Sequence, residues 1–180
     1  MKLEFYELMT QYYVQIFKFD PQKMERCCDY FINMDMGDEK SCEQGLKNVK
    51  EIMNELLSRT KMSTLNEAWF ESFLFQVFFQ NFNVYQQKKV SGTSRKKDRR
   101  FWKKLDLCIV GEDRCFVFEE TCQEMAEKAL QKLLKKKYYK IVEESKPFVL
   151  IGINVKGVEN IPIVSMNYLF NEKSGNGREV

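Results

Sequence analysis

The sequence predicts an α/β protein in which a mixed central β-sheet is flanked by helices and preceded by a helical N-terminal part. Apolar residues recur with helical periodicity over most of residues 3–82. Two strand-like runs then surround a polar break at 111–114. The second run, a helical pattern and the apolar run 148–155 together form a β-α-β unit, so we expect two parallel strands with a right-handed crossover.

The length and composition are sufficient for one well-filled core. The chain has 180 residues, 44% of them hydrophobic and 14% aromatic. We expect N-terminal helices (1–60) packed on a core (61–170), followed by a flexible tail (171–180). Six scattered cysteines without a C-x-x-C pair favour reduced, mostly buried thiols. Neither a signal peptide nor a membrane span is indicated, so we expect an intracellular protein, cytoplasmic or nuclear.

Histidine is absent from the chain. This excludes Ser-His-Asp and Cys-His catalysis, histidine general bases and His-based zinc sites. Any hydrolytic chemistry must therefore use carboxylates, lysines and a metal ion. The net charge of +3 is too small to indicate a polyanionic partner by itself.

Three amphipathic helices are expected before residue 60. The first covers 3–18, and Asp20-Pro21 begins a second that continues to about Met34. Gly37-Asp38 ends it, and a third helix runs from about Ser41 to Leu57. We assign no chemistry to these helices.

A fourth helix is predicted from a Ser63 cap to about Phe82, with apolar residues on most sides, as in a central buried helix. The few polar residues of this helix lie along one narrow stripe on its surface. This stripe either faces solvent or brings Glu67 or Glu71 to a site, because buried acids require a partner or a metal. The stripe consists of Glu67, Glu71, Gln76 and Gln80.

A strand at 83–90 leads into the densest charge run of the chain, which extends from Arg95 to Lys104. Basic side chains neutralise phosphates and aromatic rings stack on bases, so the run is interpreted as a nucleic-acid-binding loop. The alternative is a solvated loop. The candidate nucleic-acid contacts are Arg95, Lys96, Lys97, Arg99, Arg100 and Trp102.

Residues 103–122 are expected to form a β-hairpin whose strands each carry a carboxylate. If Val110 and Cys115 close a four-residue loop, position 106 lies opposite 119 and position 104 opposite 121. Lys104, Asp106, Glu119 and Thr121 would then share one face. Opposed carboxylates are destabilising without a positive charge between them, which indicates a divalent cation. Solvated acids at an exposed sheet end are the alternative.

A helix from Cys122 to Glu143 follows, with a polar flank of residues at helical spacing. A buried strand at 148–155 comes next, and a last strand (161–169) is expected to pair with it across a turn near Gly157. The flank of the helix carries Glu124, Lys128, Gln131, Lys135 and Tyr138.

The order of these segments resembles the PD-(D/E)XK nuclease superfamily. The similarity is closest to the nuclease-like domains associated with bacterial AAA-ATPase-like proteins, and it covers about Ser63 to Leu169. Each motif is weak by itself, whereas their joint order is moderately specific. The resemblance implies a restriction-endonuclease-like core. It rests on the segments L-D-L-C-I-V, F-E-E-T, A-L-Q-K-L, K-K-Y-Y and L-I-G-I-N-V.

By this resemblance, Asp106 and Glu119 would hold Mg²⁺ or Mn²⁺, with Glu67 or Glu71 as a further ligand. Gln131 and Tyr138 would lie near the substrate backbone. Thr121 occupies the position of the family's lysine, which orients the attacking water; its hydroxyl supplies no charge. Lys104 or Lys128 would have to supply that charge.

Two functions therefore remain open. One is metal-dependent hydrolysis of DNA or RNA. The other is a degenerate pseudo-nuclease that binds nucleic acid or a protein partner. The sequence leaves the oligomeric state open.

Overall fold

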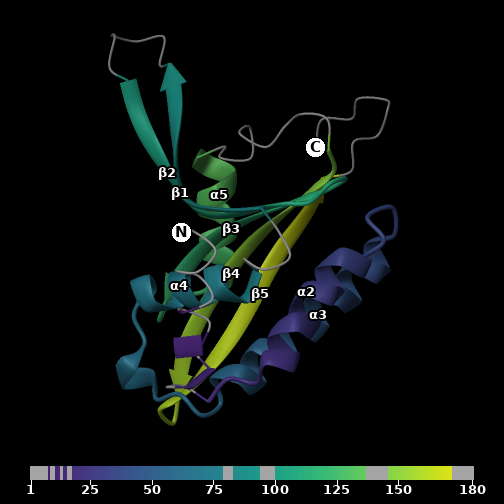
Figure 1. The fold of residues 1–180 in the computed structure, drawn as a ribbon. Helices are drawn as coiled ribbons and strands as arrows, with labels where there is room; N and C mark the ends of the chain where they lie inside the picture. Colours follow the sequence, from purple (N-terminus) through teal and green to yellow (C-terminus); the bar gives the residue numbers. More distant parts are fainter. Residues whose placement is uncertain are drawn as a thin grey trace.

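A five-stranded mixed sheet with the strand order β1-β2-β3-β4-β5 runs through the molecule (Figure 1). The computed structural model describes residues 8, 11–12, 14–15, 18–78, 83–93, 100–136 and 146–171. Only β3 and β4 are parallel; the other neighbours are antiparallel. The strands are β1 (Asn83–Thr93), β2 (Arg100–Val110), β3 (Cys115–Cys122), β4 (Phe148–Val158) and β5 (Ile161–Asn171).

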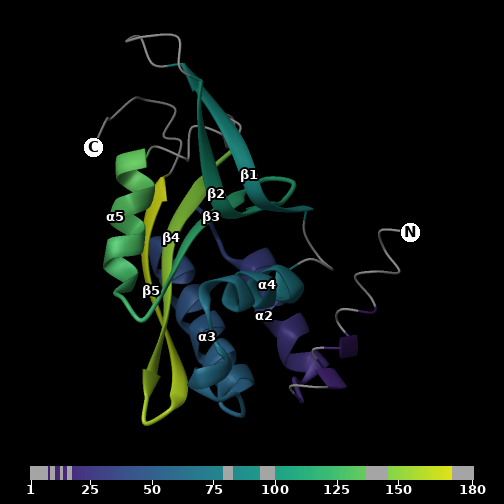
Figure 2. The same cartoon turned by 90° about the vertical axis from the view of Figure 1, so that its left-hand side faces the viewer.

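Helices cover both faces of this sheet (Figure 2). α2 (Pro21–Asn33), α3 (Glu39–Leu57) and α4 (Glu67–Phe78) lie on one face, and α5 (Ala126–Lys136) lies on the other. The predicted α/β class is confirmed. The helix expected at 3–18 falls mostly outside the described residues, and those described there, 8, 11–12 and 14–15, are helical.

Two helices begin at aspartate caps: Asp20, as predicted, for α2, and Asp38 for α3, which starts at Glu39 and not at about Ser41. The Gln22 amide donates to Asp20 Oδ1 at 3.0 Å, and the Lys40 amide donates to Asp38 Oδ1 at 3.1 Å. Each carboxylate satisfies an amide that the first helical turn leaves without a partner.

The predicted Ser63 cap of the fourth helix is wrong. Ser63 lies in a 3₁₀ turn, Met62–Thr64, and α4 begins at Glu67. Asn66 is the cap, because its Oδ1 accepts from the Trp69 amide at 2.9 Å. The cap places Glu67 in the first turn of α4 and Glu71 one turn later.

β1 and β2 form a long hairpin that projects beyond the rest of the sheet (Figure 1). β1 extends past the predicted end at Val90 to Thr93, which pairs with Arg100. Arg100 and Trp102 likewise lie in β2 and not in a loop. The cross-strand ladder continues past the point where the polar sequence indicated a turn. Residues 94–99, with Arg95, Lys96, Lys97 and Arg99, lie outside the described residues.

The β3-α5-β4 unit is confirmed, with Phe116 paired in parallel with Val149. The helix begins at Ala126 and not at Cys122, because Cys122 still pairs with Val155. Gln123 leaves the strand with φ of 65°, a left-handed conformation that neither strand nor helix continues.

β4 and β5 pair over their full length as expected, from Phe148 with Asn171 to Val158 with Ile161. Their turn is at Glu159 and Asn160 and not at Gly157. Both turn residues have positive φ (50° and 65°), as a two-residue hairpin turn with the right-handed twist of the strands requires.

The main core lies between α2, α3, α4 and the sheet. Phe31 of α2 contacts Phe78 of α4 and Phe116 of β3 edge to face, with ring centroids 4.9 and 4.5 Å apart. All six cysteines are among the described residues; none forms a disulfide and five are buried. No helix among the described residues is long and apolar enough to cross a membrane.

Candidate metal site between β2 and β3

The two central strands separate where the sequence placed its first carboxylate. The predicted register is confirmed from Val110 with Cys115 to Leu107 with Phe118, and the pairing ends there. Antiparallel alternation would next bond the Glu120 amide to the carbonyl of Leu105. Instead, Asp106 Oδ2 accepts from the Glu120 amide at 3.1 Å. A side-chain carboxylate thus bonds the amide that the backbone of β2 no longer reaches.

The expectation that Lys104 lies across from Thr121 is wrong. The backbone of Lys104 pairs with Lys89 of β1, in the part of the hairpin that has left β3. The same separation prevents Asp106 and Glu119 from pairing directly. Extrapolating the register past position 107 fails because strong twist takes the two-stranded hairpin out of the sheet.

Glu120, which the sequence analysis did not select, is a buried carboxyl with a strongly raised pKa. Its side chain is 2% exposed, and its Oε2 has no hydrogen-bond partner among the described residues. Burial raises the pKa of Glu120 to about 10, and the negative charges of Asp106, Glu71, Glu67 and Glu119 add to the rise. A carboxyl of this kind is neutral at pH 7 unless a cation lies beside it.

α4 brings two of its acids into the electrostatic surroundings of Glu120. Glu71 is only 7% exposed, so this part of the polar stripe does not face solvent. Glu67 is exposed, yet its charge raises the pKa of both Glu120 and Cys122. Gln76 is buried as well, and Gln80 lies outside the described residues. The stripe therefore runs from the surface into the negatively charged region around Glu120.

Glu119 lies on the opposite face of β3 and forms an ion pair with Lys132 of α5. The carboxylate side chain is 0% exposed, whereas that of Lys132 is 40% exposed. The sequence analysis considered Lys104 and Lys128 as sources of positive charge. Glu119 is paired instead with Lys132, one helical turn beyond Lys128 on α5. Lys128 itself is exposed.

Thr121 has a structural partner. Its hydroxyl donates to Asn154 Oδ1 at 3.2 Å, and the same oxygen accepts from the Glu124 amide at 3.1 Å. These bonds join β3, β4 and the turn that precedes α5. Thr121 therefore helps to fix the start of the helix that carries Lys132.

Gln131 is not brought to the carboxylates. Gln131 is on the exposed side of α5, where its amide donates to Glu127 at 3.3 Å. Tyr138 lies outside the described residues.

The residues fit a cation that takes few protein ligands. Among the described residues, no group of three or more Asp, Glu or Cys side chains has the placement needed to hold a metal ion. Mg²⁺ is commonly bound by only one or two carboxylates, with waters and substrate phosphates completing its octahedron. Asp106 and Glu120 could form such a pair, because the charge of Asp106 acts on the Glu120 carboxyl and the buried Oε2 of Glu120 has no hydrogen-bond partner among the described residues.

Comparisons of this chain with protein-family models, with curated proteins and with solved structures find no significant match.

Proposed function

We propose that this chain is a metal-dependent nuclease domain of the PD-(D/E)XK type, which hydrolyses phosphodiester bonds in DNA or RNA. The observation that carries the proposal is the buried carboxyl of Glu120 beside Asp106, at the point where β2 leaves β3. Burying a carboxyl among other acids lowers the stability of the folded protein. A bound cation would remove this cost, so such a carboxyl is a candidate for a functional site. Mg²⁺ or Mn²⁺ is the cation that this oxygen chemistry and a phosphate substrate favour.

In this proposal Asp106 and Glu120 hold the ion, and Glu71 and Glu67 add negative charge from α4. The ion would lower the pKa of a bound water and offset charge on the phosphate. Lys132 pairs with Glu119 on the opposite face of β3, so the proposal gives this lysine no part in the chemistry.

The projecting β1–β2 hairpin is the proposed contact with nucleic acid. Arg100 lies at its far end, opposite Thr93, and the basic residues 95–97 and 99 lie between the two strands in sequence. If the hairpin binds phosphates, replacing Lys96, Lys97, Arg99 and Arg100 by Ala should weaken binding and flatten its salt dependence, because fewer counterions are released.

The alternative is a pseudo-nuclease that binds nucleic acid or protein without cleaving. Two observations favour it: the family's lysine position holds a neutral Thr121, and Lys132 already neutralises Glu119. Metal binding separates the two functions before any substrate is identified.

Calorimetric titration with Mn²⁺ tests the site. Asp106→Asn and Glu120→Gln should each weaken binding by more than about tenfold, since even outer-shell partners commonly contribute that much. Glu124→Gln, which changes an exposed carboxylate near the start of α5, is the matched control and should bind as the parent does.

Cleavage of plasmid DNA and of single-stranded RNA in Mn²⁺ tests the chemistry. Asp106→Asn should lower the cleavage rate by at least about tenfold, since even outer-shell partners of a metal commonly contribute that much. Lys135→Met changes an exposed lysine of α5 and should leave the rate unaltered. Absence of both Mn²⁺ binding and cleavage in the parent would favour the binding module instead.

A further inference from the structure

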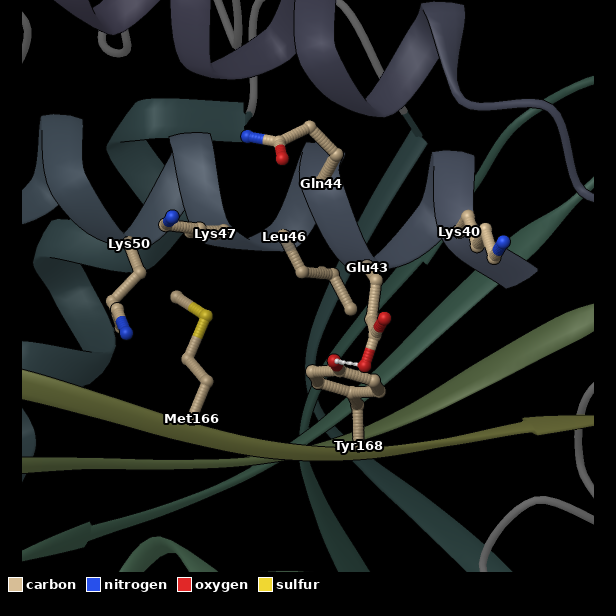
Figure 3. Close-up of a pocket in the computed structure, with 8 residues that line it drawn as sticks. All are labelled: Lys40, Glu43, Gln44, Leu46, Lys47, Lys50, Met166 and Tyr168. Carbon is tan, nitrogen blue, oxygen red and sulfur yellow. Dashed lines mark hydrogen bonds between the residues drawn. The ribbon is translucent and has the colours of Figure 1, made fainter. Parts of the chain in front are cut away.

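The free edge of the sheet lies beside a positively charged groove that is remote from the carboxylates. β5 is the last strand of the sheet and pairs only with β4 among the described residues. Between β5 and α3 lies a cavity of about 460 Å³. Figure 3 shows α3 running along β5, with Met166 and Tyr168 pointing from the strand toward the helix. The groove is lined by Lys40, Glu43, Gln44, Leu46, Lys47, Lys50, Met166 and Tyr168.

One hydrogen bond shows which backbone groups of β5 face away from β4. The Val164 amide donates to Asn54 Oδ1 of α3 at 2.7 Å, so this amide faces away from β4. In an antiparallel strand the amide and carbonyl of one residue point to the same side, and the side alternates along the chain. The backbone groups of Met166, Tyr168 and Phe170 therefore also face outward. Within the described part of the chain, none of these three residues has a backbone partner on that side.

The composition of β5 leaves this edge open to another strand. Exposed edge strands usually carry lysines or other charges that prevent pairing with foreign chains. Ile161–Asn171 contains no charged residue, although 31% of the whole chain is charged. Asn54 covers the edge only at Val164. An uncharged edge of this length can accept a strand by backbone hydrogen bonds.

The groove determines which side chains such a strand would carry. Lys40, Lys47 and Lys50 oppose a single carboxylate, Glu43, which accepts a hydrogen bond from the Tyr168 hydroxyl at 2.9 Å. Lys50 reaches down beside Met166 in Figure 3. The ten steps from Lys40 to Lys50 rise about 15 Å along the helix. An extended chain covers this distance in roughly five residues and turns alternate side chains toward one face.

We propose that the edge of β5 from Met166 to Phe170 binds an extended acidic peptide segment of a partner protein as a sixth strand, with alternate carboxylates directed at the α3 lysines. Backbone pairing would supply the affinity, and the lysines would select acidic side chains. A nucleic acid strand also carries negative charge, but it cannot satisfy a row of alternating amides and carbonyls, and Glu43 would oppose its phosphates.

The test uses a fluorescein-labelled peptide of Thr-Glu repeats and follows fluorescence anisotropy. Binding by the intact chain is expected, and Lys47→Glu should weaken it about fivefold, since a surface attraction becomes a repulsion. Lys156→Glu changes the net charge equally at an exposed position on β4 and should leave binding unaltered. A Thr-Lys peptide should not bind.

A second arm separates strand addition from simple charge attraction. Methylating alternate backbone nitrogens of the Thr-Glu peptide on its pairing edge keeps its charge and removes its donors, so binding should be lost. Hydrogen exchange should also slow at the amides of Met166, Tyr168 and Phe170 when the unmodified peptide is bound. Equal binding of the methylated peptide, no binding of the unmodified one, or tighter Lys47-dependent binding of an oligonucleotide would each overturn the proposal.

Discussion

Glu120 gives the proposed metal site its pH dependence. The pKa is raised from 4.5 to about 10 in the folded chain, first by burial and then by Asp106 and the α4 acids. Between these two pH values the folded state holds a proton that the unfolded state has released. The contribution of this group to the free energy of unfolding is fully present below about pH 4.5 and is lost as the pH rises toward 10.

We therefore expect the free energy of unfolding to fall by up to about 1.4 kcal/mol per pH unit across that window from this residue. Glu120→Gln should remove this slope and stabilise the chain at alkaline pH, because a neutral amide carries no charge to bury. Urea unfolding at about pH 6 and about pH 8 measures the difference. Glu124→Gln is the control.

Mn²⁺ provides an independent check at the same residue. By binding the ionised carboxylate of the folded state, Mn²⁺ should raise stability more at about pH 8 than at about pH 6. The Glu120→Gln chain should respond less at both values. An equal pH slope in the parent and the variant would mean that Glu120 does not titrate in this range.

At the scale of elements, the position of α5 depends on close contact with β4. A Cβ at Gly152 would collide with the carbonyl oxygen of Ala126 and the amide nitrogen of Leu130, which are backbone atoms of the helix and its first turn. Glycine is required here because helix and strand approach too closely for any side chain. The contact also sets the distance from Lys132 to Glu119 on the neighbouring strand.

Gly152→Ala should therefore push α5 away from the sheet and cost about 1 to 3 kcal/mol of stability. Thermal unfolding measures the cost. Gly37→Ala is the matched control, because a Cβ there meets only Asp35 Oδ1 at an ordinary 3.4 Å. Similar losses in both variants would contradict the argument from close approach.

On the scale of the whole molecule, the N-terminal helices and the sheet share one buried core. Phe31 is fully buried and contacts aromatic rings of α4 and β3. Phe31→Ala should cost about 3 to 5 kcal/mol, because it leaves a cavity between all three elements. Ile32→Ala, at the next and 46% exposed position, should cost much less.

The shared core also predicts cooperative unfolding. Circular dichroism, which follows the helices, and tryptophan fluorescence should give coincident transitions in urea, in the parent and in Phe31→Ala. Separate transitions would indicate that the helices form an independent unit.

Local patterns in the sequence were sufficient for most elements of the fold. The helical apolar spacing predicted α2 and α3, and the polar break at 111–114 predicted the register of Val110 with Cys115. Short-range hydrogen bonding and burial of one face determine these features, so neighbouring residues are enough to reveal them. The parallel pairing of β3 with β4 followed from the general handedness of β-α-β units.

Three features of the molecule were decided only by the tertiary structure. The first is the point at which β2 leaves β3, so that Asp106 meets the Glu120 amide and Lys104 moves away. The burial of Glu120 could have been predicted from the alternation along β3, because Glu120 lies on the same face as the buried Phe116 and Phe118. The second is the choice of Lys132 over Lys128, which depends on how α5 is rotated against the sheet.

The third feature is the open edge of β5 next to the α3 lysines, which lie more than a hundred positions earlier in the sequence. The sequence by itself determined which segments form helices and strands, because those choices depend on local periodicity. Only the packed structure decided which charged groups meet. Burial and distances of a few ångströms set those contacts, and both depend on the relative placement of elements that are far apart in the chain.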